Sequence, residues 1–111
     1  MNEEYIEILT EIQEHENSSP ERMLFLSVIF QALLDATKEK SKVESSRVSV
    51  ERANARAWFF CSVGVTCDNF EYICESAGMD AQYTRSFAIK VINSKEIKYV
   101  RQRIRRVLDK S

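Results

Sequence analysis

Glycine and proline are scarce in this chain, and that scarcity limits the folds open to it. Two glycines and one proline occur among 111 residues. These residues shape most tight turns, which an all-β protein needs about every 8 to 12 residues. Because 44% of the residues are hydrophobic, a core is expected, and this length suits one domain. The sequence therefore predicts a single all-α domain over residues 1–111, a compact bundle of about four to six helices.

The N-terminal segment is acidic and carries apolar residues at helical spacing. Residues 1–17 are expected to form either an acidic arm or a short amphipathic helix. The segment lacks the basic region and apolar run of a secretory signal, which favours a cytoplasmic protein. The apolar residues of this segment are Tyr5, Ile6, Ile8, Leu9 and Ile12.

The run Ser18-Ser19-Pro20-Glu21 indicates the start of the next helix. A serine can cap free backbone N–H groups, and proline suits the first helical position. A helix is predicted from Pro20 to about Thr37, central in the core because Leu24–Leu34 is apolar nearly all round. Its apolar stretch is shorter than the roughly 20 residues of a membrane span, so no membrane is expected. That apolar excess leaves a homodimer open.

Two further segments follow a polar connection over 38–46. A helix is predicted for Ser46–Phe60, with an inward stripe of Val50, Ala53, Ala57 and Trp58. Residues 62–67 are expected to form a short loop.

A pair of helices is predicted over residues 68–92. Asp68 and Glu71 match a helix start, Gly78 suits a left-handed helix end, and Asp80 can cap the next helix. The expected inward residues of the pair are Phe70, Ile73, Cys74, Ala77, Thr84, Phe87, Ala88 and Val91. A final basic helix is predicted over residues 94–109, with Ile97, Val100, Ile104, Val107 and Leu108 inside.

Two short helices joined by a glycine turn describe a DNA-binding helix-turn-helix. The outward stripe of the second helix would then present Gln82, Arg85, Ser86, Ile89 and Asn93, with Lys90 at its edge. Glutamine can pair with adenine and arginine with guanine in the major groove. Any antiparallel helix pair with a glycine turn has the same pattern, so this interpretation competes with simple packing.

The segment FEYICESAGMDAQYTRSFAIK resembles the promoter-reading helix-turn-helix of bacterial sigma factors. Phe70, Ile73, Cys74, Met79 and Arg85 occupy the matching positions. The resemblance implies a recognition helix that carries Arg85. Thr84 and Asp80 differ from that family, which usually has an aliphatic residue and a Thr or Ser cap there.

A second resemblance is to small uncharacterised proteins of phages and prophages. It rests on Trp58, Phe70, Cys74, Gly78, Asp80 and Arg85. It implies a mobile-element or regulatory setting and no known activity.

Charge is divided unevenly along the chain. Residues 85–111 hold nine Lys or Arg and two acids, a net +7, whereas the whole chain has a net −1. A basic surface of this kind favours a small DNA-binding transcriptional regulator, with double-stranded DNA as partner. The alternative is an adaptor or inhibitor whose last helix binds an acidic protein surface. The predicted DNA-binding residues are Gln82, Arg85, Ser86, Lys90, Lys98, Arg101 and Arg105.

Catalytic and metal constellations are not apparent in the sequence. Cys61, Cys67 and Cys74 lack the spacing of a zinc hook and are expected to be reduced thiols. His15, the only histidine, lies in the acidic N-terminal segment, far from the cysteines in sequence. No enzyme activity, cofactor or metal is expected.

Overall fold

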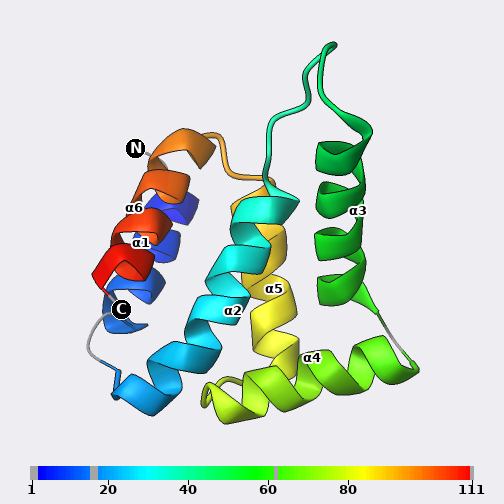
Figure 1. Cartoon of the computed structure of the whole chain (residues 1–111). Helices are drawn as coiled ribbons and strands as arrows, with labels where there is room; N and C mark the ends of the chain where they lie inside the picture. Colours follow the sequence, from blue (N-terminus) through cyan, green and yellow to red (C-terminus); the bar gives the residue numbers. More distant parts are fainter. Residues whose placement is uncertain (1–2, 16–17, 62, 111) are drawn as a thin grey trace.

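The computed structural model describes residues 3–15, 18–61 and 63–110, and for residues 3–6, 15 and 110 it describes the backbone alone. Within these ranges the chain is all-helical, as predicted, and has no strand. The helices are α1 (Glu3–His15), α2 (Pro20–Ala36), α3 (Ser46–Phe60), α4 (Val65–Ser76), α5 (Ala81–Ile92) and α6 (Ile97–Lys110) (Figure 1).

Helix α2 lies at the centre and contacts α3, α4, α5 and α6. It starts as predicted, with the Ser19 side chain accepting a hydrogen bond from the backbone N–H of Arg22 and with Pro20 in its first turn. It is not buried all round, however, because Leu24 is 66% and Val28 43% exposed. No helix covers that side of α2 in the part of the chain that the structure describes.

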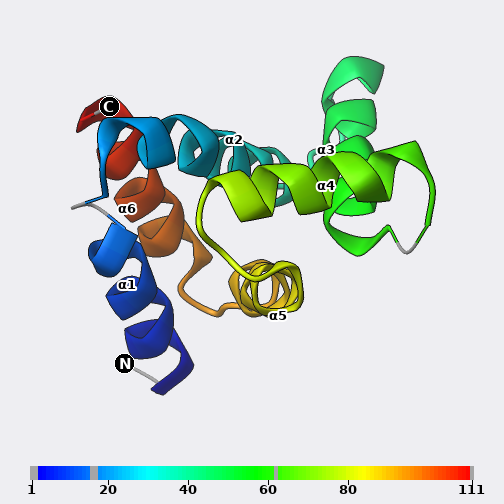
Figure 2. The same ribbon diagram turned by 90° about the horizontal axis from the view of Figure 1, so that it is seen from below.

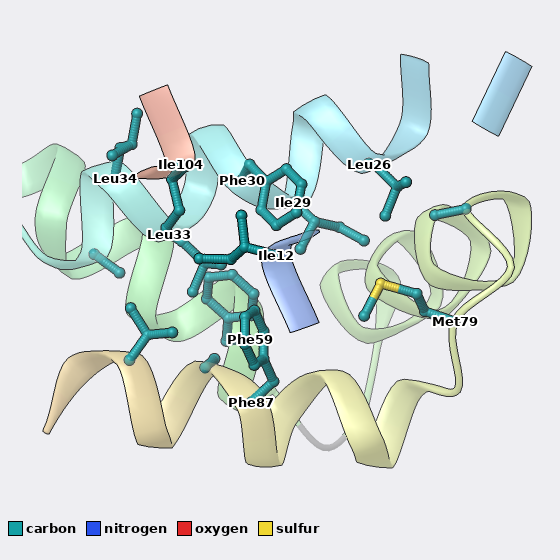
Figure 3. Packing of buried hydrophobic residues seen from close by; sticks show 14 of the residues in the cluster. Ile12, Leu26, Ile29, Phe30, Leu33, Leu34, Phe59, Met79, Phe87 and Ile104 are labelled. Atoms are coloured by element: carbon teal, nitrogen blue, oxygen red, sulfur yellow. The ribbon is translucent and has the colours of Figure 1, made fainter. Parts of the chain in front are cut away.

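The core is one cluster of buried residues drawn from all six helices (Figure 3). Phe30 of α2, Phe59 of α3 and Phe87 of α5 are among its largest members. Helix α1 joins this core through Ile8 and Ile12, which have no exposed surface. Of the two forms expected for residues 1–17, the structure therefore shows a docked helix over 3–15.

Helix α3 has the predicted bounds, but the face that it buries is not the predicted one. The predicted inward stripe is largely exposed, including Val50, Ala53 and Ala57, while Arg52, Ala55 and Phe59 are buried. Burial of the Arg52 guanidinium is compensated by Glu44, whose carboxylate oxygens accept hydrogen bonds of 3.0 and 2.5 Å. The hydrophobic periodicity of α3 could not reveal that Arg52 is buried, because its partner Glu44 lies outside the helix.

Helix α4 begins at Val65, three residues before the predicted start, so the Asp68–Glu71 capping box is wrong. Gly64, at a φ of 93°, supplies the N-cap instead. The other end follows the prediction: Gly78 has a φ of 74°, and its N–H and that of Met79 close the helix on Glu75 and Cys74.

Helix α5 follows with the predicted Asp80 cap and with Thr84, Phe87, Ala88 and Val91 buried. In both views it runs across the direction of α4 (Figures 1 and 2). It also contacts every other helix of the molecule, so α4 and α5 do not stand apart as an isolated pair.

Helix α6 starts at Ile97, later than predicted, and packs against α1 and α2. Its inward residues Val100, Ile104 and Val107 are buried as expected. None of the described helices combines the length and apolarity that crossing a lipid bilayer requires.

Candidate nucleic-acid interface

The predicted reading face of α5 is only partly present. Gln82, Ser86, Ile89 and Asn93 are exposed along one line of the helix, as expected. The two cations assigned to this face, Arg85 and Lys90, are both partly buried. The exposed line therefore consists of neutral side chains.

Arg85 points into the molecule instead of outward, which corrects the prediction. Its Nε donates to the Phe59 carbonyl at 3.1 Å, and its Nη2 donates to the Cys61 carbonyl at 3.1 Å. The guanidinium carbon lies 4.8 Å from the centre of the Phe70 ring, a cation–π contact. Arg85 thus links α5 to the end of α3 and to α4, and its Nε and Nη2 groups already donate hydrogen bonds within the chain.

Lys90 forms an ion pair with Glu7 of α1. A small cleft between α1 and α5 is lined by Glu7, Glu11, Tyr83, Ser86 and Lys90, among others. Burial, followed by the hydrogen bond with Glu11, raises the pKa of Tyr83 well above its usual range. Acidic α1 residues therefore border the exposed line of α5, which disfavours the approach of phosphates there.

Arg85 is one of four arginines that bind carbonyls at helix C-termini. Helices α2, α3 and α4 carry no basic residue in their last turns, although the partial negative charge at a helix end favours a cation. Arginines from elsewhere supply it. Arg22 donates to Ala77 and Gly78 at the end of α4, and Arg85 donates to Phe59 and Cys61 at the end of α3. At the end of α2, Arg56 donates to Ala36 and Arg101 to Leu34.

Cations converge around the end of α2 in a groove of about 530 Å³, called here the basic groove. Its walls come from the segment after α2, from α3 and from α6 as far as Arg105. Glu39 is the one acid among its lining residues, which otherwise include six cations: Lys38, Lys40, Arg56, Lys98, Arg101 and Arg105.

Three of these cations, Lys38, Arg56 and Arg101, are held by contacts within the chain; the Nε of Arg56 donates to the Ala36 carbonyl at 2.9 Å. Lys38 pairs with Glu51 at 2.7 Å and with Asp35 at 3.5 Å, and the hydrogen bond with Glu51 raises its pKa. Arg101 donates to the Leu34 carbonyl and to the Thr37 hydroxyl, each at 2.5 Å. Burial lowers the pKa of Arg101, and the positive charge of Arg105 lowers it further.

The other three cations form the outer part of the groove. Lys40, Lys98 and Arg105 are exposed. They make no hydrogen bond or ion pair with any residue in the described ranges. Their charges are therefore available to an anionic ligand, and Arg105 adds to the positive potential at Arg101.

The structure does not bring the seven predicted site residues together: Arg85 points inward, and Gln82 is exposed on α5 but lines neither the cleft nor the groove. Lys98, Arg101 and Arg105 lie together in the basic groove, whereas Ser86 and Lys90 lie in the cleft beside α1. Whether any of them contacts DNA stays a prediction. The predicted site residues did not include Lys38, Lys40 and Arg56. These residues belong to a polar connection and to another helix, and no local sequence pattern links them to α6.

The thiols lie outside this groove. Burial is the main cause that raises the pKa of both Cys67 and Cys74, so their reactive thiolate forms are disfavoured. No group of three metal-ligating side chains occurs among the described residues. The side chain of His15 lies outside those residues, as does that of Lys110.

Compared with known family models, curated proteins and solved structures, the chain gives no significant match.

Proposed function

We propose that this chain is a small DNA-binding protein with a regulatory role in transcription, and that it holds the phosphate backbone of duplex DNA in the basic groove. The observation that carries the proposal is the convergence of six cations and a single acid in one groove. A phage or prophage setting is part of the proposal and rests on the sequence resemblance alone.

The contacts would position the duplex more than they would read its sequence. Lys40, Lys98 and Arg105 are exposed and project from two separate segments, so they can contact successive phosphates. Arg101 and Arg105 lie close enough for one charge to lower the pKa of the other, and a phosphate between them would relieve that repulsion. Phosphate contacts carry little sequence information by themselves.

The test is fluorescence anisotropy of a labelled duplex across a salt titration. The wild-type chain is compared with Lys98→Ala/Arg105→Ala, which removes two outer cations of the groove. Each lost phosphate contact should reduce the slope of log affinity against log salt by about 0.9, so the double variant should lose about 1.8.

The matched control is Lys95→Ala/Arg106→Ala, which removes the same charge from exposed residues that do not line the groove. Its slope should stay much closer to that of the wild-type chain. Equal losses in the two double variants would show only diffuse attraction, and no binding at low salt would refute the proposal.

An acidic protein surface is the second candidate ligand for the same groove. It is favoured by the partly buried, apolar Ile97 among the lining residues, since phosphates need no apolar contact. Under this alternative, Ile97→Ser would weaken the protein complex while leaving the salt slope for DNA unchanged.

A further inference from the structure

Two of the three cysteines lie where α3 ends and α4 begins. Cys61 is the residue directly after α3, and Cys67 belongs to the first turn of α4. In Figure 1, the end of α3 and the start of α4 lie at the same corner of the molecule. Gly64, at a φ of 93°, is in the connection between these two helices. The two cysteines are called here the thiol pair.

The guanidinium of Arg85 contacts both members of the thiol pair. Its Nη2 atom donates to the Cys61 carbonyl at 3.1 Å and to the Cys67 sulfur at 3.6 Å. The two thiols also influence each other, because burial, Glu71 and the neighbouring Cys61 thiol, in that order, raise the pKa of Cys67. An interaction of this kind acts over about 4 to 6 Å. The Cys61 and Cys67 side chains therefore share one small space.

We propose that the thiol pair is a redox modification site, which hydrogen peroxide converts into an intramolecular Cys61–Cys67 disulfide and which small thiols reduce again. In reducing compartments, disulfides are usually transient and serve catalysis or redox sensing. Neither cysteine lines the basic groove, so this inference does not depend on the proposed function.

The two thiols differ in exposure, and this difference sets the order of the reaction. Cys61 is partly exposed, whereas Cys67 is only 5% exposed. Burial also keeps Cys67 in the less nucleophilic thiol form by raising its pKa. Peroxide therefore oxidises Cys61 first. A sulfur–oxygen bond forms, the oxygen–oxygen bond breaks, and one water leaves as the thiol becomes a sulfenic acid.

Cys67 completes the reaction. Its thiol donates a hydrogen bond to Oε1 of Glu71 at 3.4 Å, so a carboxylate is in place to take up the proton. The Cys67 sulfur then attacks the sulfenic sulfur of Cys61. A sulfur–sulfur bond forms, the sulfur–oxygen bond breaks, and the hydroxide leaves with that proton as a second water. Two thiols and one hydrogen peroxide thus give one disulfide and two waters.

Cys74 provides an internal control for this selectivity. It follows Cys67 by seven residues on the same helix, about 10 Å along the axis, whereas the Cα atoms of bridged cysteines lie within about 7 Å. It also has no exposed surface. In the unfolded chain, by contrast, Cys67 is six residues from Cys61 and seven from Cys74. Selective pairing with Cys61 is therefore expected only in the folded chain.

Mass spectrometry of the folded chain after treatment with hydrogen peroxide tests the proposal. The intact chain should lose two hydrogen atoms, and iodoacetamide should then label Cys74 alone once the chain is unfolded. Proteolytic cleavage before Asp68 leaves Cys61 and Cys67 on one peptide and Cys74 on the next. The loss of two hydrogens should be confined to the first peptide, and dithiothreitol should reverse it.

Variants separate the roles of the individual groups. Cys67→Ser should abolish the disulfide, and Cys61 should gain oxygen instead; Cys61→Ser, at the more exposed residue, should also abolish it. The matched control is Cys74→Ala, which removes a thiol but should form the disulfide like the wild-type chain. Glu71→Gln should slow disulfide formation about tenfold or more, and the sulfenic acid of Cys61 should accumulate. An unchanged rate would overturn the role assigned to Glu71.

Three results would overturn the proposal itself. In the first, all three thiols of the peroxide-treated folded chain still react with iodoacetamide. In the second, the folded chain forms a bridge to Cys74 or between two chains. In the third, treatment in urea gives the Cys61–Cys67 bridge with the same selectivity as in the folded chain, so that proximity in sequence alone would account for it.

Discussion

The exposed side of α5 and the basic groove both contain residues that the sequence predicts to bind DNA. The cations of α5 have partners within the chain, whereas the outer cations of the groove are exposed. On α5, Arg85 is held by two backbone carbonyls and Lys90 by Glu7. In the groove, Lys98 and Arg105 extend into solvent beside Lys40. A cation is available to bind a polyanion only where it is not already paired within the protein.

Helix ends explain much of this difference. Arg22, Arg56, Arg85 and Arg101 each donate to carbonyls at the C-terminus of a helix that lacks a basic last turn. These arginines connect elements distant in sequence while they offset the helix dipole. Net charge in a segment therefore overstates the charge that is available for binding.

The largest effect is expected for Arg85→Met, which should lower the free energy of unfolding by about 3 kcal/mol through the loss of two carbonyl hydrogen bonds and the Phe70 contact. Urea denaturation measures it, with Arg85→Lys as the control that keeps the charge and should lie in between. DNA affinity of the folded variant should stay within about twofold of the wild-type value. A stable variant that no longer binds DNA would restore the recognition-helix interpretation.

The groove variant Lys98→Ala/Arg105→Ala should show the opposite behaviour. Its free energy of unfolding should change by less than about 0.5 kcal/mol because both side chains are exposed and unpaired in the described structure. Its DNA affinity should fall about tenfold or more at moderate salt. Urea denaturation and fluorescence anisotropy on the same sample measure the free energy of unfolding and the DNA affinity of this variant. A marked loss of stability would contradict the expected difference between these groove cations and Arg85.

A smaller effect concerns Tyr83, whose pKa is raised mainly by burial and then by Glu11. The folded chain therefore keeps a proton that the unfolded chain releases above its ordinary pKa of about 10. The free energy of unfolding should fall as pH rises from about 9 to 11. Tyr83→Phe should reduce that fall in a series of urea curves, and an unchanged pH dependence would mean that α1 does not constrain this edge of α5.

The smallest effect is expected on the exposed line of α5. Gln82→Ala/Ser86→Ala should leave DNA affinity and the preference between duplex sequences unchanged, since neither residue lies in the basic groove. If α5 read bases, each lost contact would cost about 1 to 3 kcal/mol of discrimination. Competition between duplexes of different sequence measures this discrimination. Reduced discrimination in the variant would contradict the expectation that the exposed line of α5 does not contact bases.

Local signals account for the parts of the fold that the sequence predicted. Ser19 with Pro20, Gly78 and Asp80 act on the backbone within a few residues of themselves, so their effects can be recognised without a structure. The inward residues of α5 were equally clear, because Thr84, Phe87, Ala88 and Val91 fall at the i, i+3, i+4 and i+7 spacing of one helix face. The start of α4 was missed because Gly64 caps it through its backbone conformation.

The sequence by itself determined that this chain is helical, where most of its helices begin and end, and that its last third is basic. Only the tertiary structure decided which face of α3 is buried and which cations remain available. The physical reason is that burial of Arg52 depends on Glu44, and engagement of Arg85 and Arg101 depends on carbonyls 24 to 67 residues away. Such partners meet only when the helices pack.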